Sequence, residues 1–190
     1  MKKNNRYEFL SPEILDQAVV DITEIARESG VRLVLVGGYA MQLYGSPRLT
    51  ADVDVAALEM LGSLEPEQEL SFGGAQVRAP NGVPVDIIVR DDEYAPLYSK
   101  AVETAKRVQG VPLSVVRPEY LAAMKMAAGR RGKNDADLEF LVAAEVVDIA
   151  KARRVIQKFL GIYAAREFDQ LVRVVHWKRG TPGPDGAESR

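Results

Sequence analysis

Hydrophobic residues divide the chain into a first part, in which helical and extended patterns alternate, and a second part that is helical throughout. Ser11-Pro12-Glu13 is typical of a helix start, and apolar side chains then recur at helical spacing as far as Gly30. The aliphatic run that follows is too short for a helix and predicts a buried strand. The pattern therefore predicts, in order, a helix ending at Gly30, a strand over 31–36, a short helix over 39–44 and a strand over 52–57.

The next stretch predicts a hairpin, a helix and the last strand of the sheet. Residues 58–74 are rich in Glu and lack clear periodicity, which indicates a loop or a weak surface helix. Asn81-Gly82 is a strong turn dipeptide between two apolar runs, so a hairpin is expected there. The elements predicted for this part are hairpin strands over 76–79 and 83–89, a helix over 92–107 and a strand over 113–116.

From residue 117 onward every periodic segment is helical. Helices are expected over 118–128, 134–144, 148–160 and 164–175. The predicted fold class is α/β (α+β), with a small mixed sheet and flanking helices followed by a helical C-terminal region. The corresponding division is a core over 1–116, a helical domain over 117–177, and a polar, Gly- and Pro-containing tail over 178–190 that we expect to be disordered.

Composition excludes several kinds of chemistry. The 190 residues contain no cysteine and one histidine, so thiolate sites and zinc sites with several imidazoles are excluded. The formal net charge of −2 argues against general coating of nucleic acid, although a local basic patch remains compatible with RNA or a nucleotide. No apolar run suits secretion or a membrane span, so a cytoplasmic protein without a membrane partner is expected.

Three aspartates stand within the predicted apolar strands. Asp52 and Asp54 are two residues apart and so project from one face of a strand, and Asp86 lies in a Val-Asp-Ile-Ile strand. In one interpretation, two of these aspartates are exposed charges at strand edges and the third caps a turn. In the other, the three form one site. Valine or another apolar residue flanks each of them, and buried unpaired carboxylates are costly, which favours a site in which two Mg²⁺ ions compensate the charge.

The glycine pair Gly37-Gly38, Arg48-x-Thr50-x-Asp52-x-Asp54 and the later Asp86 together resemble the nucleotidyltransferase superfamily typified by DNA polymerase β. More narrowly, they resemble the AbiEii-type nucleotidyltransferases of bacterial toxin–antitoxin and abortive-infection systems. The resemblance covers about 31–141 and implies a nucleotidyltransferase-type sheet. It also implies that Gly37 and Gly38 contact the triphosphate of an NTP substrate, that Asp52 and Asp54 bind both metals, and that Asp86 binds the catalytic metal and helps to activate the acceptor hydroxyl.

A second motif lies in the helical part, where Lys125 is followed by Arg130, Arg131, Lys133, Asn134, Asp135 and Asp137. Composition alone favours a solvated basic helix end. The resemblance instead implies that Lys125 neutralises nucleotide phosphate, that Lys133 belongs to the nucleotide-binding set, and that Asp137 orients basic partners or contacts the base. Asn134 stands where the family usually has its first Asp, so either Asp135 substitutes for it or the motif is weakened.

Four further residues keep two interpretations each. Arg48 and Thr50 either are structural, with Arg48 pairing with Asp54, or bind nucleotide. The second role is the one implied by the Arg-x-Thr segment that precedes the Asp-x-Asp strand in the family. Tyr39 by default packs in the core, although on the helix after the glycines it could stack on a base. His176 is more simply a helix-end residue than a catalytic one.

The resemblance implies magnesium-dependent transfer of a nucleotidyl group from an NTP to a hydroxyl, with release of pyrophosphate. In the toxin-related branch the acceptor is RNA, for example a tRNA 3′ end, or a protein side chain, and an antitoxin protein is a possible partner. Two alternatives stay open. One is an adenylyltransferase acting on a small molecule such as an aminoglycoside, and the other is a catalytically silent nucleotide-binding or antitoxin-like partner.

Overall fold

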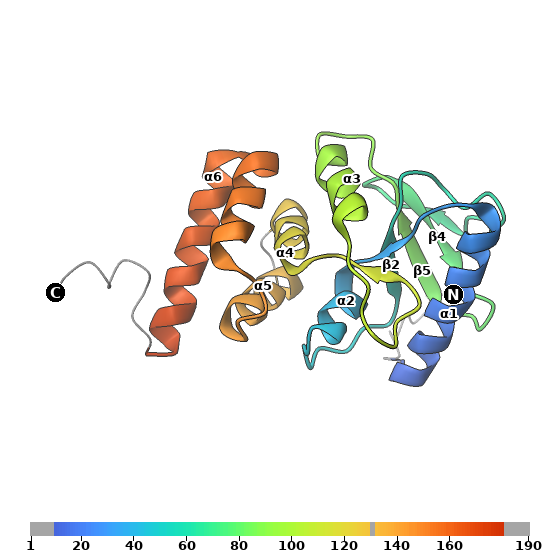
Figure 1. Ribbon diagram of the computed structural model, residues 1–190, viewed down its shortest axis with the longest axis horizontal. Helices are drawn as coiled ribbons and strands as arrows, with labels where there is room; N and C mark the ends of the chain where they lie inside the picture. The colour runs from blue at the N-terminus through green and yellow to red at the C-terminus, as the bar shows by residue number, and fades with distance from the viewer. Residues whose placement is uncertain (1–9, 130–131, 181–190) are drawn as a thin grey trace, which may run out of the picture. The chain divides into compact units, whose positions relative to one another are not determined.

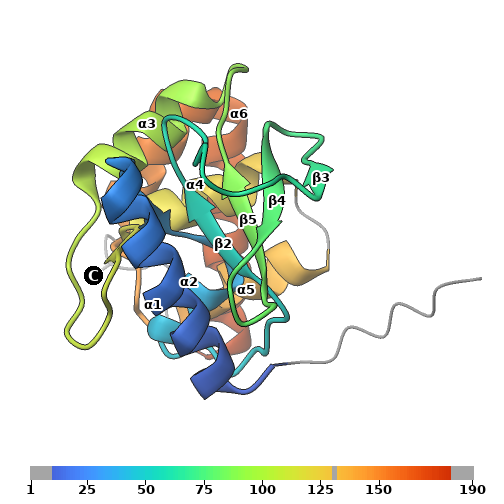
Figure 2. The same cartoon turned by 90° about the vertical axis from the view of Figure 1, so that its right-hand side faces the viewer.

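The computed structural model describes residues 10–129 and 132–180, and the chain forms two compact units, one up to Val116 and one from Arg117. The first unit contains one six-stranded mixed sheet with the strand order β3-β4-β5-β2-β1-β6 (Figures 1 and 2). Its strands are β1 Val34–Leu35, β2 Val53–Ala56, β3 Gln68–Glu69, β4 Gly74–Arg78, β5 Pro84–Ile88 and β6 Ser114–Val115. Its helices are α1 Pro12–Ser29, α2 Gly37–Leu43 and α3 Ala95–Thr104.

Helix α1 crosses one face of this sheet (Figure 2). It begins after Ser11 with proline in its first turn and ends at Gly30, whose φ of 71° is left-handed. Its buried side chains recur at helical spacing: Leu15, Ala18, Val19, Ile22 and Ala26. The amphipathic pattern in the sequence therefore corresponds to the face that α1 packs on the sheet, and the predicted fold class is confirmed.

Two elements differ from the sequence-based expectation. Gln68–Glu69 forms the two-residue strand β3 within 58–74, where a loop or weak helix was predicted. Both residues are exposed, and the strand exists because it pairs with β4 at the sheet edge, which no periodicity in the segment indicates. Helix α3 is shorter than predicted and begins at Ala95, since Pro96 suits only the first turn of a helix.

The second unit is helical and contains α4 Pro118–Ala127, α5 Lys133–Ala143 and α6 Ile149–Lys178. Helix α6 is broken at Gly161, where φ is 90° and ψ is 176°, and its two halves run side by side (Figure 1). An ion pair of 3.0 Å between Arg153 and Asp169 connects the halves, which correspond to the two separate helices predicted for this stretch.

The predicted tail over 178–190 overlaps this helix, because Lys178 is the last residue of α6. Residues 181–190 lie outside the described residues, as do Arg130 and Arg131 of the basic segment. In the described parts of the chain, no helix is both long enough and apolar enough to span a membrane.

Candidate active site

A row of polar side chains crosses four strands of the sheet in the first unit. Asp54 of β2 is the register partner of Asp86 on the parallel strand β5, and Asp86 is also the partner of Gln76 on the antiparallel strand β4. Gln76 is in turn the partner of Gln68 on β3. Since register partners project from the same face and neighbouring strands lie about 4.8 Å apart, the structure brings Asp54 and Asp86 together as neighbours.

The glycine turn is built around the Asp54 carboxylate. The backbone N–H of Gly38 donates a 3.0 Å hydrogen bond to Asp54 Oδ2. Gly37 has a φ of 58°, and a Cβ on it would lie 1.8 Å from the same oxygen. The carboxylate thus occupies the space of the missing side chain, which explains why a double glycine precedes α2.

Arg48, Thr50 and Asp52 lie beside the same turn. The Thr50 hydroxyl is buried and donates a 2.8 Å hydrogen bond to Asp52 Oδ1. A Cβ on Gly38 would lie 2.5 Å from Thr50 Oγ1 and 2.9 Å from a guanidinium nitrogen of Arg48. The Arg-x-Thr-x-Asp segment therefore packs closely on Gly38, and Thr50 fixes the first carboxylate of the pair.

Asp86 is half-buried and is held by an amide. Gln76 Nε2 donates a 2.7 Å hydrogen bond to Asp86 Oδ1. Burial raises the pKa of Asp86 above its ordinary value, the hydrogen bond from Gln76 lowers it in part, and the negative charge of Asp52 raises it further. The two acids are therefore close enough to interact electrostatically, and the charged form of Asp86 is disfavoured in the folded protein.

This shift predicts that Asp86→Asn stabilises the protein at neutral pH. Because the folded-state pKa of Asp86 lies above the unfolded value of 3.8, folding favours the protonated carboxyl, and that contribution is lost as the pH rises through the folded pKa. An asparagine avoids this loss, so its Tm should exceed that of the wild type by a few degrees at pH 7, with the difference shrinking as the pH falls toward 4. Thermal denaturation at both pH values, with the exposed Asp91→Asn as control, tests this; a lower Tm at pH 7 would contradict it.

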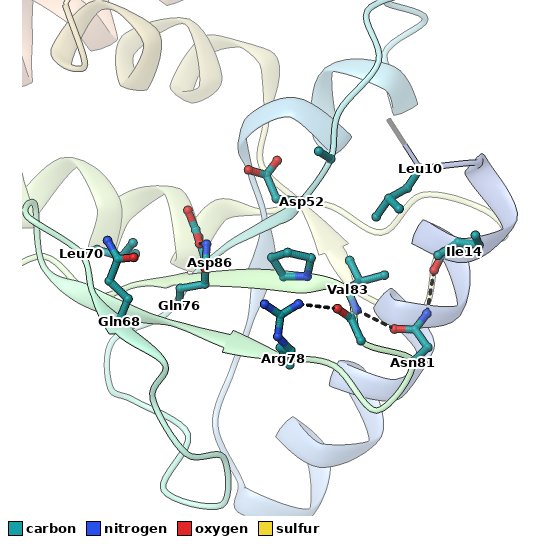
Figure 3. A pocket seen from close by; sticks show the side chains of 13 residues that line it. Leu10, Ile14, Asp52, Gln68, Leu70, Gln76, Arg78, Asn81, Val83 and Asp86 are labelled. Atoms are coloured by element: carbon teal, nitrogen blue, oxygen red, sulfur yellow. Dashed lines mark hydrogen bonds between the residues drawn. The ribbon is translucent and has the colours of Figure 1, made fainter. Parts of the chain in front are cut away.

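A hollow of about 720 Å³ opens beside these acids within the first unit (Figure 3). Asp52, immediately before β2, and Asp86 of β5 lie on the same side of the sheet, and Asn81 lies at the end nearest α1. Besides these two acids the lining side chains are neutral except for Arg78, which is paired with Glu67 at 2.6 Å. The lining residues are Leu10, Ile14, Ala51, Asp52, Gln68, Leu70, Gln76, Arg78, Asn81, Gly82, Val83, Pro84 and Asp86.

The donor set fits a magnesium ion by its chemistry, since it consists of carboxylate oxygens. Within the described residues, no three acidic or histidine side chains are arranged to hold a metal by themselves. Mg²⁺ is commonly bound through one or two carboxylates together with substrate phosphates and water, so a complete protein cage is not required. Asp52, Asp54 and Asp86 are the residues that would hold such an ion.

Lys125, Lys133 and Asp137 belong to the second unit. Lys125 Nζ lies 2.7 Å from Asp137 Oδ2, and Asp137 is only 1% exposed. Asp137 is therefore a buried ion-pair partner of Lys125, and its role toward a nucleotide stays a prediction. Lys133 is exposed at the first residue of α5, and the Asn134 side chain donates a 2.9 Å hydrogen bond to the Gly129 carbonyl. The roles of Lys125 and Lys133 toward nucleotide stay predictions.

The buried pair predicts a large loss of stability for Asp137→Ala. Removing one partner of a buried ion pair leaves a poorly solvated charge, which costs about 3–5 kcal/mol. Asp169→Ala is a matched control, because its pair with Arg153 is more exposed and should contribute about 1 kcal/mol or less. Urea denaturation gives both values, and equal losses for the two variants would show that burial of Asp137 is unimportant.

Tyr39 does not belong to the site in this structure. The residue is only 5% exposed, and its hydroxyl donates a hydrogen bond to Asp16 Oδ1 of α1. Burial and the Asp16 carboxylate raise the pKa of the Tyr39 hydroxyl, which therefore remains a donor at neutral pH. The structure thus supports the packing role and leaves no exposed ring face for a base. His176 lies in the last turn of α6.

Gln76 is a site residue that sequence analysis missed. It lies in a strand that was predicted, but its only signal is its position across the hairpin from Asp86. Gln68 was missed with β3 as a whole.

Comparisons with known proteins give the fold a context. No protein-family model matches the chain, and no curated protein matches its sequence. An antigenic nucleotidyltransferase-like protein from Paracoccidioides brasiliensis has a similar structure, with a TM-score of 0.52, 17% identity, and coverage of 91% of this chain and 92% of that chain. The antibiotic-resistance factor ANT(2'')-Ia has a TM-score of 0.53 and 16% identity, with coverage of 84% and 98% respectively. The chain therefore has a nucleotidyltransferase-like fold.

Proposed function

We propose that the protein is a nucleotidyltransferase that moves a nucleotidyl group from an NTP to a hydroxyl acceptor. The observation that carries the proposal is the placement of Asp54 and Asp86 in register on neighbouring strands, with Asp54 clamped to the Gly37-Gly38 turn. The similar folds of nucleotidyltransferase-like proteins support it. In this reaction the acceptor hydroxyl gives its proton to the Asp86 carboxylate as its oxygen bonds to the α-phosphorus. The bond from that phosphorus to the oxygen shared with the β-phosphate breaks, and pyrophosphate leaves.

Each group of residues in the proposed site has its own role. Gly37 and Gly38, whose missing side chains leave room for Asp54, Thr50 and Arg48, form the turn against which the triphosphate lies. Asp52, Asp54 and Asp86 hold Mg²⁺, which when bound neutralises phosphate charge and lowers the pKa of a bound hydroxyl. Asp86, in the lining of the hollow, receives the acceptor. The role of Lys125 of the second unit toward nucleotide phosphate stays a prediction.

We propose RNA, for example a tRNA 3′ end, as the acceptor, with a protein side chain or a small molecule such as an aminoglycoside as the alternatives. The charged side chains that line the hollow are Asp52, Asp86 and Arg78, and they do not by themselves select among these acceptors. The proposal includes a biological role as the toxin of a toxin–antitoxin or phage-defence system, with a protein antitoxin as partner.

Labelled transfer tests the proposal directly. The purified full chain is incubated with Mg²⁺ and each of the four labelled NTPs, together with total cellular RNA or protein. Label is expected in RNA, and Asp52→Ala should remove it. Label in protein alone would redirect the proposal to a protein acceptor. NTP binding measured by calorimetry without any transfer would instead identify a silent nucleotide-binding protein.

A further inference from the structure

Gln76 connects the wall of the hollow to the Asp86 carboxylate. It lies on β4 as the register partner of Asp86, and its Nε2 atom donates a 2.7 Å hydrogen bond to Asp86 Oδ1. The hairpin that joins β4 to β5 contains Asn81, which bonds through its side chain to the Ile14 carbonyl at 2.9 Å. Because both strands are fixed in this way, the amide has a defined position relative to the carboxylate.

The neighbours of Asp86 on its two sides are chemically opposite. Strand β5 lies between β2 and β4, so Asp86 has the Asp54 carboxylate on one side and the Gln76 amide on the other. The amide N–H attracts one carboxylate oxygen, and the negative charge of Asp52 acts on both oxygens. The side-chain torsion of Asp86 is therefore set from the β4 side, with Oδ1 bound to Gln76.

A glutamine is well suited to this task. A lysine or arginine in its place would neutralise Asp86 and compete with a divalent cation for the same oxygens. An uncharged amide orients the carboxylate and leaves its negative charge in place. Partners of this kind behind a metal-binding side chain typically contribute a factor of about 10–100 in metal affinity.

We propose that Gln76 is a positioning residue that holds the Asp86 carboxylate in the orientation in which it binds a divalent cation and receives the acceptor hydroxyl. The inference rests on the proposed function, and it adds a residue from the opposite strand of the hairpin to the site.

Binding of Mn²⁺ to the full chain, followed by the electron paramagnetic resonance of the free ion, tests this. Gln76→Leu keeps the approximate size of the side chain and removes the donor, and it should weaken Mn²⁺ binding about 10–100-fold. Gln17→Leu is the matched control, since the exposed Gln17 of α1 donates a 2.8 Å hydrogen bond to Asp21 outside the site. It should bind Mn²⁺ as the wild type does.

A second measurement separates positioning from general loss of structure. For nucleotidyl transfer, Gln76→Leu is expected to lower kcat about 10–100-fold while the KM for the NTP and the Tm stay within twofold and a few degrees of the wild-type values. Wild-type Mn²⁺ affinity in Gln76→Leu, alongside weakened affinity in Asp86→Asn, would overturn the role of Gln76 alone. Equal Mn²⁺ binding by the wild type and Asp86→Asn would overturn the metal site of the proposed function, and this inference with it.

Discussion

Asp54→Asn is expected to lower the rate of nucleotidyl transfer by about 10³-fold or more, with little change in stability. Asparagine has nearly the same shape, and its oxygen can still accept the N–H of Gly38, so the glycine turn should persist. The substitution removes one negative charge from the pair that Asp54 forms with Asp86. Loss of metal-mediated charge stabilisation costs several kcal/mol, and about 4 kcal/mol corresponds to 10³-fold in rate.

Transfer from the preferred labelled NTP, with the Tm recorded for each variant, measures this effect. Asp91→Asn serves as control because it makes the same substitution at an exposed position outside the site. It should retain the wild-type rate. Transfer by Asp54→Asn within tenfold of the wild-type rate would contradict the assignment of Asp54 to the metal site.

Gly37→Ala is expected to lower the transfer rate about 10²-fold and to destabilise the fold. The added Cβ would lie 1.8 Å from Asp54 Oδ2, so the carboxylate or the turn has to move, and a displacement of about 1 Å in an active site costs about 10²-fold. The left-handed backbone at Gly37 adds about 1–2 kcal/mol of strain for any residue with a side chain.

Gly30→Ala separates these two effects. Gly30 also has a positive φ, 71°, but a Cβ on it would meet no atom within 4 Å. This control should show the strain in urea denaturation and retain full transfer activity. If Gly37→Ala lost no more activity than Gly30→Ala, close contact between the glycine turn and Asp54 would not matter for function.

The strands and helices of the first unit could largely be predicted, because the buried positions of each element leave a hydrophobic pattern within its own segment of the sequence. The run 31–36 and the alternation around Asp86 both report how each residue is buried, and the structure contains β1 and β5 there. Strand β3 could not be predicted, because Gln68 and Glu69 are exposed and owe their conformation to pairing with β4. Pairing at a sheet edge leaves no trace in the hydrophobic pattern.

The residues of the candidate site likewise divide into those that the sequence predicted and one that it could not. The three aspartates stood out because acids among aliphatic residues are uncommon. The hydrogen bond from Gly38 to Asp54 was found only in the structure. Gln76 could not be found in this way. A two-residue turn at Asn81-Gly82 would pair Val77 with Asp86, whereas the observed register pairs Gln76 with Asp86. A difference of one residue in the hairpin decides which side chain contacts the carboxylate.

The parallel register of β2 and β5 has a consequence for how this site can vary. Val53 and Val85 pair beside Asp54 and Asp86, and Val55 pairs with Ile87 on the other side. Sliding one strand by a single residue would place a carboxylate in the core and an aliphatic chain on the active face. The packing of these valines and isoleucines therefore also keeps the two acids opposite each other. An insertion within either strand would therefore disrupt the core and the chemistry together.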